Sequence, residues 1–533
     1  MSYIGQEGEG MKKQSLLKGA LILTIAALIT KILGFANSII QSRILGSEGI
    51  GLVMMVMPLM GLLMTLTTLG LPVAISKLVA EAEVQNKTTQ IKQILVVSLV
   101  VTGSLSILFV MITLGLGPIF STHLLTDQRS YYSLLALIPI IPIFAVSGVL
   151  KGYFRGRQTM TPIAVSQVLE QIVRIALIFF IVQWLLPYGI EYAAAGAILC
   201  SVIGEAFSLF YLVFKFRTSN RYKVNLRQPH KRKIWSQGKH TLLELLHTGL
   251  PTTGNGLIHS IARVISPILI TQGLAKAGMS SVLITKQFGM LAGFVMPLLF
   301  FPGFINHSLA AAMVPAISEA NAQKNYRLIH QRVYQAVRIA LIVGAPSTVI
   351  LYVFAEPLME VIYHAPEAAV LLKVLAPFFL FHYFHAPLQS TLVGLGYAKA
   401  AMMNNLLSRA VSLALIYPLC SNPVLGIKGV LLAMSIGVIL ETFLHFFSMV
   451  KLIGYHLKTF ELLKVVFSGL LMGYMGLIFF NHLKGGLLFQ TMMAIVSSLF
   501  LYLLLLILLR VIRRNDIVRV PLIGKRLSFF FRN

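Results

Sequence analysis

The sequence is long, apolar and strongly basic. Its 533 residues are 57% hydrophobic and only 11% charged, with a formal net charge of +27 and a mean hydropathy of +0.83. Soluble domains carry about 25% charged residues, so this composition excludes a soluble globular protein. The basic residues lie between apolar segments rather than on a polar domain. That distribution argues against a nucleic acid as partner and favours contact with anionic membrane lipids.

Apolar segments separated by polar residues predict about fourteen membrane-spanning helices. Each segment is long enough to cross the hydrocarbon layer as a helix, and the segments are too continuous to be barrel strands. The sequence therefore predicts an all-α polytopic membrane protein. The first span lacks a small-residue cleavage site, so we expect it to remain in place. The expected spans cover residues 15–40, 51–76, 93–118, 131–150, 162–186, 190–214, 247–271, 281–307, 337–359, 368–393, 401–420, 426–450, 459–481 and 487–510.

Basic residues are distributed unevenly among the connecting segments. If the N-terminus is cytoplasmic, 33 of the 44 Lys and Arg residues fall in cytoplasmic segments and five fall in outer segments. Cytoplasmic loops of membrane proteins carry the excess of Lys and Arg. We therefore expect a multi-pass protein of the cell membrane with both termini in the cytoplasm.

A weak internal repeat predicts two lobes. Pro72 and Pro315 lie in similar motifs, and Gly152 and Gly394 each follow a later span. The number of residues from Pro72 to Pro315 is nearly the same as the number from Gly152 to Gly394. Transporters are often built from such repeats, with the substrate between the halves. The expected organisation is a polar N-terminal extension at 1–10, an N-lobe at 11–217, a basic cytoplasmic linker at 218–246, a C-lobe at 247–452, two C-terminal spans within 453–512 and a basic cytoplasmic tail at 513–533.

Charged residues inside the expected spans are the candidates for function. Each costs about 2.5–3.5 kcal/mol to insert, and cations outnumber carboxylates two to one, so they cannot all be neutralised in pairs. The surplus predicts a cavity that receives an anion. The cations are Lys31, Arg174, Arg263, Lys286, Lys373 and Arg409, and the carboxylates are Glu170, Glu205 and Glu441.

The span at 162–186 carries a polar stripe. Gln167, Glu170, Gln171 and Arg174 are spaced so that they share one helical face. Glu170 and Arg174, four residues apart, are placed to form an ion pair. Two interpretations remain open for this pair: a neutral contact between helices, or a cavity wall that binds a polar head group.

The spans at 247–271 and 281–307 carry further polar residues. Asn255, His259 and Arg263 follow one another at intervals of four, and Lys286 lies in the next span. Neither Arg263 nor Lys286 has an acid one turn away in its own helix, and the same is true of Lys31. We therefore expect these three cations to line a cavity, whereas Lys373 lies near a span end and is expected to extend toward the surface.

Glu441 and His445 lie four residues apart in the span at 426–450. Such a pair would relay protons or hold a cation, or would form a buried hydrogen-bonded contact. His382 and His385 have no acidic residue nearby in the sequence, so we expect no metal site and no cofactor. The only aspartates are Asp127 and Asp516, and no phosphate-binding loop is present, so we expect no enzyme. Cys200 and Cys420 are expected to be inert buried thiols.

Motifs along nearly the whole chain resemble those of the stage V sporulation protein B family. They occur in the same order as in that family, from the first span to the tail. The matching segments are 18–19, 30–35, 70–82, 150–156, 166–174, 187–197, 250–254, 286–289, 314–319 and 520–524.

This resemblance implies a two-lobe, fourteen-span flippase of the multidrug/oligosaccharidyl-lipid/polysaccharide (MOP) superfamily. It also implies export of a lipid-linked peptidoglycan precursor for the spore cortex. The lipid II flippases are more distant relatives with a cationic central cavity; Lys31 matches a cavity arginine of theirs, and Lys286 is the match for another. Asn37 stands where they carry a further arginine, and the second span lacks their basic pair, so the exact substrate stays open.

The combined hypothesis is a flippase for an undecaprenyl-pyrophosphate-linked sugar similar to lipid II. Lys31, Arg263 and Lys286 would bind the pyrophosphate, Arg174 would assist, and Glu170 would hold Arg174. Gln171 and Asn255 would contact the head group. One alternative is an ion-coupled exporter of other polysaccharide-lipids or of amphipathic drugs. Another is a non-transporting scaffold that recruits cortex-synthesis proteins through the basic linker.

Overall fold

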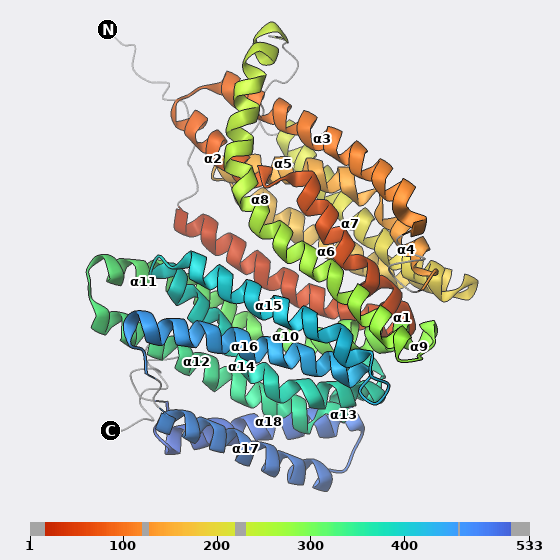
Figure 1. The fold of residues 1–533 in the computed structure, drawn as a ribbon, viewed down its shortest axis with the longest axis vertical. Coiled ribbons are helices and arrows are strands. Elements are labelled where there is room, and N and C mark those ends of the chain that lie inside the picture. Colours follow the sequence, from red (N-terminus) through yellow and green to blue (C-terminus); the bar gives the residue numbers. More distant parts are fainter. Residues whose placement is uncertain (1–15, 120–126, 219–230, 457–458, 513–533) are drawn as a thin grey trace, which may run out of the picture. The chain divides into compact units, whose positions relative to one another are not determined.

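The computed structural model describes residues 16–119, 127–218, 231–456 and 459–512, and their regular secondary structure is helical throughout (Figure 1). Among these residues, 12 helical segments are long and apolar enough to cross a membrane. The first, Leu21–Val84, contains 64 residues and corresponds to two of the expected spans. Helix α15 (Ala398–Cys420), which contains Asn404, Asn405 and Arg409, corresponds to another but is not among the twelve. The predicted all-α polytopic fold is confirmed.

Helix α1 (Leu16–Thr68) changes direction at Gly46 (Figure 1). Gly46 has φ 63° and ψ −174°, a backbone conformation that side chains with a Cβ rarely adopt. The break lies between the first two spans expected from the sequence. A second turn follows at Gly70, with φ 65°, and a proline then occupies the first turn of α2 (Leu71–Val84), where its missing N–H has no helical partner to lose.

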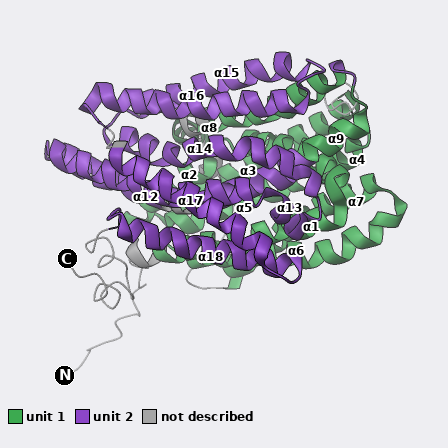
Figure 2. Ribbon diagram, turned by 90° about the horizontal axis from the view of Figure 1, so that it is seen from below, with its two compact units in different colours: residues 1–275, 279–289 green, residues 276–278, 290–533 purple. Residues whose placement is uncertain are grey.

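The described residues form two compact units, coloured separately in Figure 2. Unit 1 comprises Met1–Ala275 and Met279–Gly289. Its core joins α2, α3, α5 and α7 through buried residues such as Ile75, Ile94, Tyr153 and Leu212. Beyond α1 and α2, its helices are α3 (Thr88–Ile119), α4 (Ser130–Leu137), α5 (Ile140–Gly156), α6 (Thr161–Leu185), η2 (Leu186–Tyr188), α7 (Ile190–Thr218), α8 (Lys231–Lys276) and α9 (Ser281–Gly289).

Unit 2 comprises Lys276–Gly278 and Met290–Asn533. One core joins α11, α12, α14 and α16, and a second joins α12 to α17 and α18. With α15, its helices are the π-helix η3 (Met290–Val295), α10 (Met296–Phe300), η4 (Phe301–Gly303), α11 (Phe304–Ala322), α12 (Tyr326–Val353), α13 (Ala355–Tyr363), η5 (Pro366–Ala368), α14 (Ala369–Gly394), α16 (Ile427–Ile453), α17 (Thr459–His482) and α18 (Leu487–Leu508).

The repeat expected from the sequence appears as the same contact in each unit. In unit 1, a Cβ added to Gly152 of α5 would lie 2.7 Å from the Pro72 carbonyl oxygen and 3.2 Å from the Ile75 Cβ. In unit 2, a Cβ added to Gly394 of α14 would lie 2.9 Å from the Val314 carbonyl oxygen and 2.8 Å from the Ile317 Cβ. Both positions thus need glycine, because a neighbouring helix approaches too closely for a side chain.

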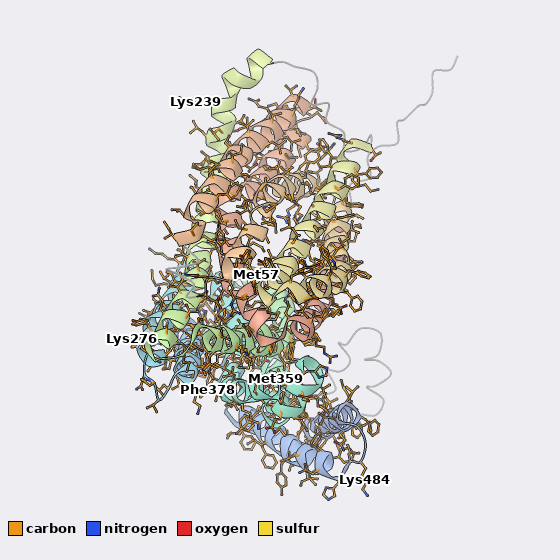
Figure 3. The ribbon with its side chains drawn as sticks, turned by 90° about the vertical axis from the view of Figure 1, so that its right-hand side faces the viewer. Met57, Lys239, Lys276, Met359, Phe378 and Lys484 are labelled. Atoms are coloured by element: carbon orange, nitrogen blue, oxygen red, sulfur yellow. The ribbon has the colours of Figure 1, made fainter. Side chains whose placement is uncertain are left out.

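The expected linker is partly helical. Helix α8 begins at Lys231, well before the span expected at 247–271, and Figure 3 shows Lys239 on it with Lys276 at its far end. Lys484 lies in the turn between α17 and α18 (Figure 3). The N-terminal extension at 1–10, the tail at 513–533 and linker residues 219–230 lie outside the described residues. The expected lobe boundaries and the orientation of the termini stay predictions.

Candidate functional site

The ion pair expected within α6 is present in unit 1. Arg174 donates a hydrogen bond to the Glu170 carboxylate one turn away. The structure adds two residues that the sequence analysis did not connect to this pair. Glu205 of α7 interacts with the Glu170 carboxyl group, and Lys151 of α5 donates to Glu205 Oε1 at 2.9 Å. We call Lys151, Glu170, Arg174 and Glu205 the α5–α7 charge cluster.

The α5–α7 charge cluster contains two basic side chains and two carboxyl groups, so every charged group has a partner of opposite sign close by. The Glu205 side chain is almost fully buried and those of Glu170, Arg174 and Lys151 are mostly buried. Buried charges are retained only when they are paired and hydrogen-bonded. Glu205 had no base nearby in its own helix, which was the one sign in the sequence that its partner would come from another helix.

Lys286 of α9 also has an acidic partner, from a helix distant in the sequence. Its Nζ lies 3.5 Å from Glu48 Oε2, just beyond the break in α1. The two helices approach closely: a Cβ added to Gly51 would lie 2.1 Å from the Thr285 carbonyl oxygen, and one added to Gly289 would lie 1.9 Å from the Ser47 carbonyl oxygen. The expectation that Lys286 has no acid in its own helix holds, but another helix supplies one.

Glu48 also joins Lys286 to the loop before α4. Arg129 Nη1 donates to Glu48 Oε1 at 2.6 Å, and its Nε and Nη2 donate to the two carboxylate oxygens of Asp127 at 3.1 and 2.9 Å. Thr285 Oγ1 donates to Asp127 Oδ2 at 2.8 Å. We call these residues the Asp127–Lys286 network. Burial alone would raise the pKa of Asp127, but the hydrogen bonds from Arg129 and Thr285 outweigh it and lower that pKa below its ordinary value.

Two of the expected cavity cations have no acidic partner among the described residues. Lys31 is exposed on the first half of α1, and its side chain makes no ion pair or hydrogen bond within that part of the chain. Arg263 is exposed on α8, where its Nε donates to the His259 carbonyl oxygen of the same helix at 3.4 Å. Helix α8 is joined to α1 nearby, because Thr65 Oγ1 lies 3.2 Å from Ser260 Oγ.

The remaining polar candidates of unit 1 differ in their surroundings. Gln171 is half-buried and its Oε1 has no hydrogen-bond partner. Asn37 is buried, and its Oδ1 has no hydrogen-bond partner among the described residues. The Asn255 side chain lies outside the described side chains. Lys373, in unit 2, extends to within 3.9 Å of Glu356 at an exposed position.

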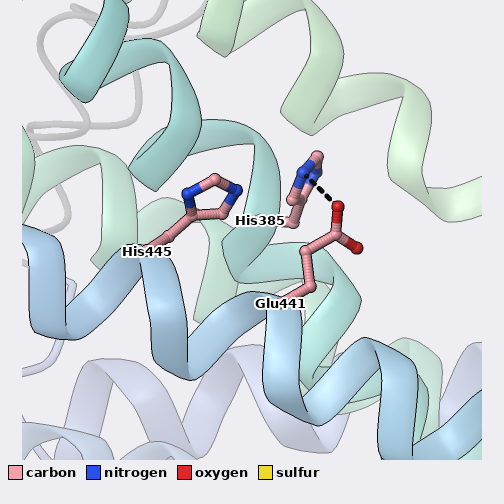
Figure 4. A group of neighbouring side chains, drawn as sticks. All are labelled: His385, Glu441 and His445. Carbon is pink, nitrogen blue, oxygen red and sulfur yellow. Dashed lines mark ion pairs between the residues drawn. The ribbon is translucent and has the colours of Figure 1, made fainter. Parts of the chain in front are cut away.

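Glu441 and His445 belong to a larger polar group in unit 2. Figure 4 shows them on α16 facing His385 of α14, whose Nε2 lies 3.0 Å from Glu441 Oε1. His385 has no acidic residue nearby in the sequence, as stated above, but the fold brings Glu441 next to it. The carboxylate comes from a helix 56 positions further along the chain, so local sequence gave no sign of it. Both cysteines are buried and free, as expected.

Comparison with solved structures identifies the class of protein. The chain aligns over 94% of its length with all of a structure described as lipid II flippase MurJ in an inward closed conformation, with a TM-score of 0.70 and 15% identity. It also aligns over 82% of its length with 98% of an inward-facing multidrug resistance transporter of the MOP superfamily, with a TM-score of 0.64 and 17% identity. The helices therefore define a multi-pass membrane protein with the MOP transporter fold.

Sequence comparison identifies the family. A family model described as polysaccharide biosynthesis protein matches residues 16–321, and a second model, described as MatE, matches residues 291–417. The chain is 44% identical to stage V sporulation protein B of Bacillus subtilis (strain 168) over 97% of its length and 99% of the relative. The chain belongs to the polysaccharide biosynthesis protein family, within the stage V sporulation protein B group.

Proposed function

We propose that the chain is a flippase that moves an undecaprenyl-pyrophosphate-linked peptidoglycan precursor, similar to lipid II, across the cell membrane for spore cortex synthesis. The names of two similar proteins support this substrate class: a sporulation protein of Bacillus subtilis and a lipid II flippase. On this proposal, the two lobes open alternately to the two sides of the membrane. The sugar and pyrophosphate cross through the protein, and the lipid tail stays in the bilayer.

The observation that carries the proposal is the state of Lys31 and Arg263. Both lie within membrane-spanning helices, both are exposed, and neither has an acidic partner among the described residues. A cation that faced lipid at this depth would cost several kcal/mol. A water-filled cavity that binds a pyrophosphate removes that cost, because phosphate oxygens are strong acceptors for Lys and Arg.

The other two cations would have subordinate roles on this proposal. Lys286 would bind the pyrophosphate only by exchanging Glu48 for it, and Glu48 would keep its contact with Arg129. Arg174 would remain held by Glu170 and would contribute through the polar stripe with Gln171, whose Oε1 is unpartnered. Lys31 and Arg263 are therefore the residues on which binding depends most.

Rescue of a strain depleted of lipid II flippase activity tests the proposal. Lys31→Ala and Arg263→Ala each remove one charge-assisted contact, which is worth about 1.5–3 kcal/mol. We expect each variant to lower transport about tenfold or more, and the double variant to abolish rescue at unchanged membrane expression. Lys399→Ala removes an equally exposed cation at the start of α15 and is the matched control. Full rescue by the double variant would contradict the site.

Two further measurements separate the alternatives. A drug exporter predicts increased sensitivity of a deletion strain to amphipathic drugs and no accumulation of precursor on the inner side of the membrane. A scaffold predicts that neutralising the bases at 215–239 reproduces the deletion, whereas Lys31→Ala and Arg263→Ala have no effect. A flippase predicts that precursor accumulates on the inner side of the membrane in the deletion strain. It also predicts that Lys31→Ala and Arg263→Ala reproduce the deletion, whereas neutralising the linker bases does not.

A further inference from the structure

The polar group around His385 lies inside unit 2, where three helices meet. His385 comes from α14, Glu441 and His445 come from α16, and Asn405 comes from α15. One ligand atom each from His385, Glu441 and His445 lies within 4.8 Å of the others (Figure 4). Only Glu441 and His445, both on α16, are close in sequence. The fold therefore brings the other residues of the group to them.

We propose that His385, Glu441 and His445 bind a divalent transition-metal ion of the Zn²⁺ class. Ligand atoms about 2.0–2.2 Å from a tetrahedral Zn²⁺ lie roughly 3.3 Å apart. The His385 Nε2 and Glu441 Oε1 atoms are already 3.0 Å apart. All three ligand atoms lie within 4.8 Å of one another, so binding would draw His445 about 1–2 Å closer to the other two ligands.

Asn405 is placed to complete the coordination. In one orientation of its amide, Oδ1 lies 2.8 Å from His445 Nε2 and 3.5 Å from His385 Nε2 and would supply a fourth ligand. In the other orientation, which satisfies the hydrogen bonds of the group without an ion, the amide nitrogen lies 2.8 Å from His445 Nε2. With the amide turned over, its nitrogen donates to Glu441 Oε1 at 3.1 Å and its oxygen accepts from Gln389 Nε2 at 2.8 Å. The amide thus has one orientation that offers oxygen to an ion and another that satisfies the group without one.

Neighbouring residues orient the ligands. The Asn404 amide nitrogen lies 3.3 Å from His445 Nδ1 and donates to Ser448 Oγ at 2.9 Å. The ring of His382 stacks on that of His385 with centroids 5.9 Å apart. Histidine ligands are commonly fixed by a partner on the nitrogen that does not bind the metal. If His445 bound the ion through Nε2, its Nδ1 would carry the proton, and the Asn404 amide would have to present its oxygen rather than its nitrogen to that N–H.

Burial and charge both favour a cation. His445 is fully buried, whereas the side chains of His385 and Glu441 each keep 17% exposure, so an ion reaches the group from the side of these two residues. Glu441 is an acid within a membrane-spanning helix, and its one ion-pairing contact among the described residues is with His385. A bound divalent ion would balance the charge of this carboxylate.

The ligand types indicate which ion fits. Imidazole nitrogen suits Zn²⁺ and other late first-row ions, whereas Na⁺, Mg²⁺ and Ca²⁺ prefer sites made of oxygen ligands. Two imidazoles with one carboxylate form a ligand set found at zinc sites. We therefore expect selectivity for Zn²⁺ over the hard cations.

Zn²⁺ titration of the full chain, purified in detergent through an affinity tag without histidine, tests the proposal. Competition with a chromophoric chelator should report one ion per chain. His385→Gln, Glu441→Gln and His445→Gln should each weaken binding tenfold or more. His482→Gln changes an exposed histidine at the end of α17, a helix that contributes no residue to the group, and should leave the affinity within a factor of about two.

Because His445 is fully buried, its variant requires a second measurement. Zn²⁺ should raise the Tm of the wild type and of His482→Gln, and X-ray absorption should show two imidazoles around the bound ion. Equal Zn²⁺ affinity in the wild type and Glu441→Gln would overturn the proposal. So would a Tm that depends on pH through Glu441 but not on Zn²⁺, which would assign the group to protons. Neither result involves lipid substrate, so failure here and failure of the flippase proposal are distinguishable.

Discussion

The two units share a packing contact and differ in their charged groups. Gly152 and Gly394 occupy matching places at which a neighbouring helix passes over a glycine. At the level of charge the units diverge: unit 1 holds cations paired with carboxylates in the α5–α7 charge cluster and the Asp127–Lys286 network, whereas unit 2 holds His385, Glu441 and His445. Packing between helices is thus repeated, and the ionisable groups are particular to each unit.

This difference separates two kinds of constraint. A glycine beneath a helix is required by sterics, and the requirement returns wherever the same helix pair returns. A buried charge requires only that some partner lies close, and the partner comes from whichever helix is nearest. The comparison is therefore open to test at both levels, by substituting the shared glycines and by removing single charges.

The largest loss of stability is expected from a substitution of Glu205, which belongs to the α5–α7 charge cluster of unit 1. Glu205→Gln leaves Lys151 largely buried without its carboxylate. Removing one partner of a buried ion pair costs about 3–5 kcal/mol. We therefore expect the free energy of unfolding to fall by about 3 kcal/mol, as measured by thermal unfolding in detergent. Glu244→Gln, which removes an exposed carboxylate on α8, should change stability by less than about 1 kcal/mol. Equal losses in the two variants would show that the cluster is not structural.

The next effect tests the shared contact. Gly152→Ala and Gly394→Ala each place a methyl group within 3 Å of a carbonyl oxygen on the neighbouring helix. Overpacking of this kind costs about 1–3 kcal/mol, and we expect similar losses in the two units. Gly103→Ala in unit 1 and Gly469→Ala in unit 2 meet nothing closer than 3.6 Å and should be neutral or stabilising. A loss in one unit only would break the correspondence between the repeats.

A pH-dependent effect is expected at Asp127. Its folded pKa lies below the ordinary 3.8 because Arg129 and Thr285 bind the ionised form. The ionised carboxylate therefore stabilises the fold above that pH, and its contribution is lost as the pH falls through the lowered value. Asp127→Asn should cost about 1–2 kcal/mol at pH 7. Its Tm should fall less between pH 5 and pH 3 than that of the wild type, and parallel curves would contradict this role.

The smallest effect is expected at Lys373. Its Nζ lies 3.9 Å from Glu356 Oε2, and both side chains are exposed. Exposed pairs contribute about 0–1 kcal/mol, so Lys373→Gln should shift the Tm by less than about 2 °C and should leave rescue intact. Loss of rescue at normal stability would place Lys373 among the substrate-binding cations and would give unit 2 a share in the anion site.

The fold was predictable because it depends on local patterns. Apolar length marks which segments are helical, although α8 and α12 begin at Lys231 and Tyr326, well before the spans expected at 247–271 and 337–359. The Glu170–Arg174 pair was predictable for the same reason, since both residues lie on one helical face. Glu48 with Lys286, Lys151 with Glu205 and His385 with Glu441 were not, because each joins helices distant in the sequence. A lone charge in a span indicates that a partner is needed, but not which helix supplies it.

The π-helical turn at Met290–Val295 has a consequence for how changes in length act on this chain. It begins at the residue where unit 1 gives way to unit 2. A π turn holds one residue more than an α turn. Deleting a single residue there would let ordinary α-helix run through from α9 to α10. The wider π turn takes up that residue, so the deletion would leave the helical phase of α10 as it is, whereas the same deletion in an ordinary α turn would shift the phase of the following residues of the helix by about 100°. Register, rather than composition, is what this short segment holds constant.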